Sequence, residues 1–169
     1  MQFKLASAVA LLAAVSPALA SPLSAQLQEL SASTAQVNEI FSDVTLVNFF
    51  QQMPKGFHNY QDVIKSKSKD IQNSPSMIID EEQPAVCEDF VTFATITQDL
   101  MNTLIGKHGL LSQTPFTAPV AALLRTDEGV TDALVFNVKG LAPKCEEQIK
   151  APADKLQDAY SKALKTYSD

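Results

Sequence analysis

Residues 85–105 read AVCEDFVTFATITQDLMNTLI and place apolar side chains in two stripes at helical spacing. Together the stripes cover well over a 100° face, so a helix built from this segment must be covered on two sides. We therefore predict a bundle of helices with this helix in its middle. The stripes consist of Cys87, Val91, Ala94 and Met101 on one side and of Phe90, Phe93, Ile96, Leu100 and Leu104 on the other.

Upstream, a first helix is predicted to begin near Leu23, where apolar residues start to recur every three or four positions. The stripe continues through Val44 into an apolar cluster that contains Phe49 and Phe50. Proline and glycine in Met53-Pro54-Lys55-Gly56 are expected to end the helix there.

A second, shorter helix is predicted from Tyr60 to Ile71. Its apolar residues again recur at helical spacing, and a proline follows shortly after its end. The alternating lysines of this segment, Lys65, Lys67 and Lys69, are expected to point to water.

The middle helix has its own start and stop signals. Carboxylates in Asp80-Glu81-Glu82-Gln83-Pro84 favour a helix start, and proline is tolerated in the first turn. Gly106 and Gly109 are expected to end the helix. The connection that follows, Leu110–Pro119, is longer and more apolar than most bundle loops, so it should pack against the helices or cover something.

Two further helices complete the predicted bundle. The fourth runs from Val120 to Val138, with Gly129 as a weak point and Asp127-Glu128 on its solvated face. The fifth runs from Cys145 to Tyr167 at heptad-like spacing, and Pro152 should kink or interrupt its first turns. No strand-type alternation of useful length and no internal repeat is visible, so the fold class is all-α.

The chain has two cysteines, Cys87 and Cys145, each in the first turn of a predicted helix. In an antiparallel bundle the third and fifth helices run in the same direction, so both cysteines lie at the same end. Paired cysteines are usual in exported chains. We therefore predict a single-domain antiparallel bundle of about five helices with one disulfide, worth about 4 kcal/mol of stability.

The N-terminus has the pattern of a signal peptide over residues 1–20. Lys4 is followed by an apolar run from Leu5 to Val15 and by the small-residue ending Ala18-Leu19-Ala20. This run is shorter than a helix that spans a bilayer, and no later stretch is a transmembrane candidate. We expect cleavage after the small-residue ending and a secreted domain, residues 21–169, that is either free or associated with a cell wall.

The charge balance argues against a nucleic-acid partner. Removal of Lys4 with the signal peptide leaves 12 of the 13 basic residues and all 19 acidic ones, so the net charge is about −7. Such a surface repels phosphate backbones. The chain also has a single arginine, Arg125, and no cluster of lysines interleaved with aromatic residues.

The sequence carries no recognisable catalytic or metal-binding pattern. It lacks a Gly-x-Ser-x-Gly motif, and its two histidines, His58 and His108, fall in different predicted loops. The acidic groups at Asp80-Glu81-Glu82 and Glu146-Glu147 are explained by their positions at helix starts. No spacing of cysteine and histidine suggests zinc. We predict a non-enzymatic protein without cofactor or metal.

Apolar side chains exceed what five short helices obviously need, since the chain has nine phenylalanines. All of this surface could be core. Alternatively, it forms a cavity or groove for a fatty acyl chain, with the Leu110–Phe116 segment as its lid. Hydroxyl and amide groups along the middle helix could then hold a carboxylate, or they face water or bond to the preceding turn. These groups belong to Thr92, Thr95, Thr97, Gln98 and Thr103. The candidate pocket residues are Phe49, Phe50, Phe90, Phe93, Leu100, Leu104, Leu110, Leu111, Phe116 and Leu134.

Several segments carry a resemblance to a known family. Residues 156–167 read LQDAYSKALKTY, and Leu104-Ile105-Gly106-Lys107 is followed by Pro115-Phe116 and by PVAALLR over residues 119–125. With five helices and no tryptophan, the layout resembles the fungal family of hydrophobic surface-binding protein A and Mp1-type cell-wall galactomannoproteins. The resemblance implies a protein that adsorbs to hydrophobic surfaces, helps to recruit lytic enzymes there, or encloses a fatty acid in a helical cavity.

Two functions from different classes therefore remain open. The first is a secreted binder of lipids or hydrophobic surfaces, with secreted enzymes or cell-wall components as further partners. The second is a secreted inhibitor or effector that acts through protein contacts, similar in outline to four-helix inhibitors of invertases and pectin methylesterases. An elongated void beside the middle helix favours carriage of a lipid, and a filled interior favours adsorption or protein contact.

Overall fold

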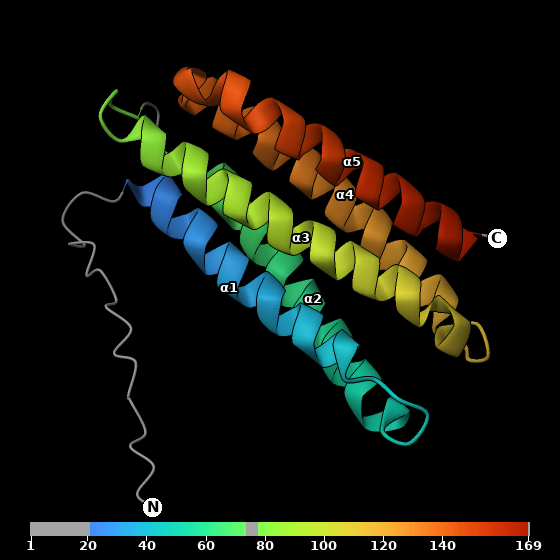
Figure 1. Ribbon diagram of the computed structural model, residues 1–169. Coiled ribbons are helices and arrows are strands. Elements are labelled where there is room, and N and C mark those ends of the chain that lie inside the picture. The colour runs from blue at the N-terminus through green and yellow to red at the C-terminus, as the bar shows by residue number, and fades with distance from the viewer. Residues whose placement is uncertain (1–20, 74–77, 169) are drawn as a thin grey trace, which may run out of the picture.

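The computed structural model of the protein describes residues 21–73 and 78–168. These residues form five long helices and no strand, which confirms the predicted all-α bundle (Figure 1). The expected signal peptide, residues 1–20, lies outside the described residues. The elements are α1 (Pro22–Ser42), α2 (Phe49–Gln72), α3 (Gln83–Leu111), α4 (Thr117–Leu141), the short 3-10 helix η1 (Pro143–Cys145) and α5 (Glu146–Ser168).

The five helices form a ring, and each has two main neighbours (Figure 1). α3 packs against α1 and α5, as expected for a helix that is apolar on two sides. α1 in turn packs on α2, α5 packs on α4, and α2 meets α4 to close the ring. The core therefore fills the middle of the ring.

The boundary between α1 and α2 differs from the prediction. α1 ends at Ser42, and Phe49 and Phe50 open α2 instead of closing the first helix. Nζ of Lys107 in α3 donates to the carbonyl oxygens of Ser42 (2.7 Å) and Val44 (2.9 Å). These bonds satisfy carbonyl groups that a helix end leaves free. A contact between segments far apart in the sequence therefore helps to decide where α1 ends.

Pro54 and Gly56 lie inside α2, so the prediction that they end a helix is wrong. Pro54 removes the N–H that would pair with the Phe50 carbonyl, but Phe50 is 83% exposed and water can replace that donor. Gly56 permits a close approach of α1, because a Cβ there would lie 2.9 Å from Cε1 of Phe41. The surroundings of Pro54 and Gly56 in the folded protein therefore explain why both can lie inside α2.

α3 continues through Gly106 and Gly109 to Leu111, so the prediction that these glycines end the helix is also wrong. Leu104 and Leu111 lie two turns apart on one face and are fully buried. Their burial outweighs the roughly 1 kcal/mol that each glycine costs in a helix. The apolar connection between α3 and α4 is accordingly reduced to residues 112–116.

The last two helices lie close to their predicted positions. α4 begins at Thr117 and contains Gly129 without a break. α5 begins at Glu146 directly after η1. It is continuous through Pro152, so the helix is not interrupted there.

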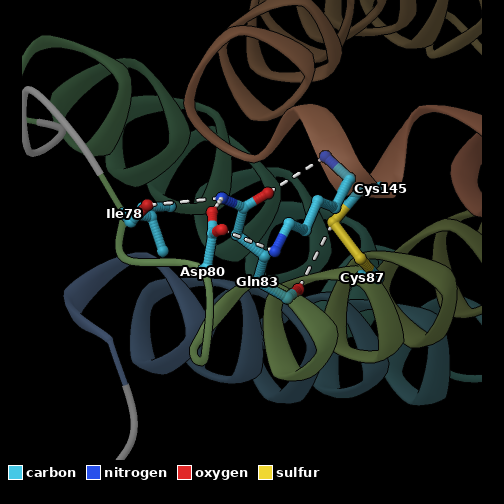
Figure 2. Close-up of a disulfide and its surroundings, with 6 residues drawn as sticks. Ile78, Asp80, Gln83, Cys87 and Cys145 are labelled. Carbon is cyan, nitrogen blue, oxygen red and sulfur yellow. Dashed lines mark hydrogen bonds and ion pairs between the residues drawn. A yellow bond between two sulfur atoms is a disulfide. The ribbon is translucent and has the colours of Figure 1, made fainter.

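Cys87 and Cys145 form the predicted disulfide, with their Cα atoms 5.1 Å apart (Figure 2). α3 and α5 begin at the same end of the bundle, as the prediction required (Figure 1). The buried Gln83 adds a second link, since its Oε1 accepts from the backbone N–H of Lys144 (3.0 Å) and its Nε2 donates to Asp80 (3.1 Å). Lys144 and Asp80 also form an ion pair at 2.6 Å. We call this side of the molecule the clamped end.

Candidate functional site

The ten apolar candidates separate into a core set and a set at one end of the bundle. Phe49 is 4% exposed and its neighbour Phe50 is 83% exposed, although both open α2. Leu110 and Phe116 are half-buried beside the α3–α4 connection. The other six are buried in the core, namely Phe90, Phe93, Leu100, Leu104, Leu111 and Leu134.

A pocket of about 240 Å³ opens to the surface where the α1–α2 connection meets the α3–α4 connection. We call it the mouth pocket. Three predicted candidates, Phe49, Phe50 and Leu110, contribute to its wall. Leu46 also lines the pocket, although it was not among the candidates. The full lining consists of Leu46, Phe49, Phe50, Leu110, Gln113, Thr114 and Pro115.

The two segments that meet at the mouth pocket carry no charge. Residues 44–54 and 109–124 contain no Asp, Glu, Lys, Arg or His, in a chain with 19 acidic and 13 basic residues. Leu46 (76% exposed), Val47 (98%) and Phe50 (83%) stand out into solvent there. Contiguous exposed apolar side chains mark a surface that binds something apolar. We call these two segments the uncharged end, which lies opposite the clamped end (Figure 1).

A series of aromatic rings leads from the mouth pocket into the bundle. Successive ring centroids lie 5.2 to 6.3 Å apart. Phe116 comes from the α3–α4 connection, whereas the other rings belong to α1 and α2. The rings follow one another in the order Phe50, Phe49, Phe116, Phe57, Phe41 and Tyr60.

The aromatic series ends at a buried group of polar side chains. Asp127 was predicted on a solvated face and Lys67 was predicted to point to water, but both are fully buried and pair at 2.7 Å. Both predictions are wrong. Asp127 also accepts hydrogen bonds from the hydroxyls of Tyr60 (2.6 Å) and Tyr160 (2.5 Å), and Lys67 donates to Thr131 (3.3 Å). We call these five side chains the polar cluster.

The polar cluster is electrically balanced, and it joins α2, α4 and α5. Nζ of Lys67 also lies 5.0 Å from the centroid of the Phe93 ring, which favours a cation. Burial, with the nearby Asp127 carboxylate, raises the pKa of Tyr60 and of Tyr160 well above the ordinary value of a tyrosine. Both hydroxyls therefore remain protonated and keep donating to Asp127.

The stripe positions contain a signal for this cluster. Lys67 falls three residues after Ile64 on the inward face of α2, and Asp127 falls three residues after Leu124 on the inward face of α4. Lysine and aspartate are almost never fully buried unless they are paired. Opposite charges at inward positions of two helices therefore indicate a buried pair.

The hydroxyl groups along α3 are used within the helix. Thr92, Thr95 and Thr97 each donate to a carbonyl oxygen in the preceding turn. Of the roles considered for these hydroxyls, bonding to the preceding turn is therefore the one that the structure shows.

The histidines do not lie where the sequence placed them. His58, predicted in a loop, belongs to α2 and lies 3.4 Å from Asp62 on an exposed surface. His108 lies in the last turn of α3 and packs against Tyr167, with ring centroids 5.0 Å apart. Residues 21–73 and 78–168 contain no group of side chains that could hold a metal ion. None of the helices described there is long and apolar enough to cross a membrane.

Comparison with known proteins identifies the fold. The sequence matches no family model and no curated protein. Among solved structures, AFMP4P in complex with palmitic acid is similar with a TM-score of 0.79 and 13% identity, over 86% of this chain and 97% of that chain. Ligand binding domain 1 of the Penicillium marneffei MP1 protein, complexed with arachidonic acids, is similar with a TM-score of 0.73 and 17% identity, over 86% of this chain and 95% of that chain. The chain therefore has the helical fold of the Mp1-type ligand-binding domain.

Proposed function

We propose that this chain is a secreted, non-enzymatic protein that binds a single-chain lipid of the fatty-acid type through the mouth pocket. The observation that carries this proposal is an apolar pocket at an uncharged end, with Leu46 and Phe50 exposed at its rim. The likeness in fold to proteins crystallised with palmitic acid and with arachidonic acids supports it.

Burial of the acyl chain would supply the binding free energy. Each methylene group removed from water contributes about 0.8 kcal/mol, so ten contribute about 8 kcal/mol before the costs of ordering the ligand. The mouth pocket, at about 240 Å³, is smaller than the roughly 300 to 1,000 Å³ of most ligand sites. A long chain therefore also needs space within the aromatic series.

The first test is equilibrium dialysis of radiolabelled myristic acid against purified residues 21–169. Phe50→Asp places a charge at the rim of the pocket and should weaken binding at least about tenfold. Phe136→Asp is the matched control, because Phe136 is 80% exposed on α4 and does not line the pocket. Failure of the unmodified chain to bind myristate, or an equal loss in both variants, contradicts the proposal.

The exposed rim also favours a second candidate function, which is adsorption to a hydrophobic surface. Val47 is 98% exposed and does not line the mouth pocket. Val47→Asp should therefore reduce adsorption to a hydrophobic film and leave myristate binding nearly unchanged. Equal adsorption of this variant and the unmodified chain contradicts the second function. The alternative of a secreted inhibitor stays a prediction, which a pull-down from secreted enzymes tests.

Export after cleavage of residues 1–20 is part of the proposal. The local structure at residue 21 supports it, because the Ser21 side chain accepts from the backbone N–H of Ser24 (3.1 Å) and caps α1. Pro22 follows in the first turn, where proline is favoured. Protein recovered from culture medium should begin at Ser21 by mass spectrometry, and a product that retains residues 1–20 contradicts this part.

A further inference from the structure

The side chains inside the bundle bear on the orientation in which a lipid binds and on the length of acyl chain that is buried. We infer that the lipid enters tail first through the mouth pocket and that the polar cluster stops its terminal methyl group. The head group then stays in water at the uncharged end, so the ligand class is single-chain lipids with varied head groups. This inference rests on the proposed lipid binding.

Phe116 links the aromatic wall of the mouth pocket to the rings further along α2. Its ring contacts Phe49, which lines the pocket, and stacks on Phe57, two turns further along the helix, with centroid distances of 5.2 and 5.6 Å. Phe49 and Phe57 belong to α2, whereas Phe116 comes from the short α3–α4 connection. The Phe116 ring can therefore move aside, and make room for an acyl chain, without displacement of a helix.

The core contains two adaptable side chains. Met53 is fully buried in α2 between Phe49 and Tyr60, and Met101 is fully buried in the second half of α3. Methionine is unbranched and has three rotatable bonds, so it fills gaps of different shapes. These side chains can repack around an acyl chain that takes the place of the Phe116 ring.

The polar cluster closes this apolar path. Asp127 accepts three hydrogen bonds, and Lys67 donates to two partners and lies over the Phe93 ring. A methyl group that moved past the cluster would separate these partners inside the protein. Leaving either charge buried and unpaired costs far more than burial of one more methylene contributes.

The same cluster excludes a lipid that enters head first. Lys67 and Asp127 already balance each other, so a buried fatty carboxylate would be an additional negative charge without a partner. At the mouth pocket the carboxylate meets water and the polar groups of Gln113 and Thr114. The tail-first orientation therefore leaves every charge either paired or solvated.

The distance from the mouth pocket to the polar cluster sets the length of the buried chain. The step along α2 from Phe49 to Tyr60 spans about 17 Å at about 1.5 Å per residue. An extended acyl chain advances about 1.3 Å per carbon, which is the projection of a C–C bond of about 1.5 Å. About thirteen carbons therefore fit alongside α2 before the chain reaches the level of Tyr60.

Competition against radiolabelled myristic acid on the unmodified chain tests the orientation. Methyl myristate and myristoyl lysophosphatidylcholine should compete within about threefold of myristate, because only the head group differs. Tetradecanedioic acid, with a carboxylate at both ends, should compete at least about 100-fold more weakly. Equal competition by the diacid, or failure of both head-modified lipids, overturns this inference alone. Failure of myristate itself to bind overturns the proposed function as well.

A series of saturated fatty acids from 10 to 18 carbons tests the depth. In the unmodified chain the affinity should rise about fourfold per methylene and level off near 14 carbons. In the double variant Lys67→Met with Asp127→Leu, whose folding is checked by circular dichroism, it should continue to rise to 18 carbons. A continued rise in the unmodified chain, or the same plateau in the folded double variant, overturns the inference. If the double variant does not fold, the unmodified chain's plateau and the diacid result decide.

Discussion

At the scale of single residues, Asp127 of α4 is held in the core by donors from two other helices. Tyr60 and Lys67 reach it from α2, and Tyr160 reaches it from α5. Buried ion pairs are often no more stabilising than apolar side chains of the same volume, but one partner left alone is strongly destabilising. The pair of Asp127 and Lys67 therefore contributes little to the stability of the helical bundle. Its main effect is to exclude other groups from this part of the core.

Substitution of one charge and of both charges should have very different effects. We expect Asp127→Leu to lower the free energy of unfolding by about 3 to 5 kcal/mol, because Lys67 is left buried without a partner. Asp127→Leu combined with Lys67→Met should restore most of this loss. Urea unfolding followed by circular dichroism measures both, with exposed Asp132→Leu on the same helix as control. A double variant as unstable as the single variant contradicts this view of the pair.

Two of the three buried tyrosines, Tyr60 and Tyr160, should make the protein sensitive to alkali. Burial and Asp127 raise the pKa of Tyr60 and of Tyr160 in the folded state, whereas the unfolded chain keeps a value near 10. Above about pH 10 the unfolded chain loses protons that the folded chain keeps, so the free energy of unfolding falls by about 1.4 kcal/mol per pH unit for each tyrosine. Urea midpoints from pH 8 to 12 should show this fall, and Tyr60→Phe with Tyr160→Phe should reduce it. An unchanged profile in that variant argues against the assignment.

At the scale of elements, the apolar faces of the helices could be predicted, but the boundary between α1 and α2 and the end of α3 could not. The two stripes in residues 85–105 predicted the position of α3 between two neighbours, and the cysteines predicted which end carries the disulfide. The end of α1 is held by a hydrogen bond from Lys107, and Gly56 in α2 is required by the close approach of the Phe41 ring. Both are contacts across the bundle that local sequence does not display.

Only part of the candidate site could be predicted, and the reason is similar. Spacing shows which face of a helix is apolar but not whether another helix covers it, so Phe50 and Phe90 look alike in the sequence although one is 83% exposed and the other 0%. Leu46 and Val47 were predicted in one helix together with Phe50, but they lie in the α1–α2 connection and are exposed. The polar cluster was hidden because lysine and aspartate were assigned to solvent by residue type.

A pair of glycine substitutions tests the packing between α1 and α2. Gly56→Ala should lower the free energy of unfolding by about 1 to 3 kcal/mol, because the added Cβ would lie 2.9 Å from the buried Phe41 ring. Gly129→Ala should raise it by about 0.5 to 1 kcal/mol, since no heavy atom lies within 4 Å of that Cβ and alanine favours the helix. Thermal unfolding of both variants provides the comparison. Effects of the same sign show that close packing is not the reason for Gly56.

At the scale of the whole molecule, the two ends have different roles. The clamped end joins α3 to η1 through a disulfide, the buried Gln83 and an ion pair between Asp80 and Lys144 (Figure 2). The uncharged end carries the mouth pocket and the exposed apolar rim. A lipid that enters at the uncharged end can rearrange the helices there while the clamped end stays fixed.

Loss of the disulfide should therefore affect stability more than lipid binding. We expect Cys87→Ser with Cys145→Ser to lower the free energy of unfolding by about 4 kcal/mol, because the bridge closes a long loop with a sequence separation of 58. Myristate affinity of the fraction that remains folded should stay within about threefold of the unmodified value. Denaturation and equilibrium dialysis on the same preparation measure both. A large loss of affinity in the folded fraction shows that the clamped end takes part in binding.

The most direct test of the central claim is nuclear magnetic resonance of isotopically labelled protein titrated with myristic acid. The claim is that the uncharged end admits the lipid. Backbone amide shifts should change most at residues 46–50 and 110–116 and along α2 as far as Tyr60, while amides around Gln83 stay unchanged. Shift changes centred on the clamped end or on the groove between α1 and α2 beside Ser33 and Ser66, or no shift changes at saturating myristate, would contradict the claim.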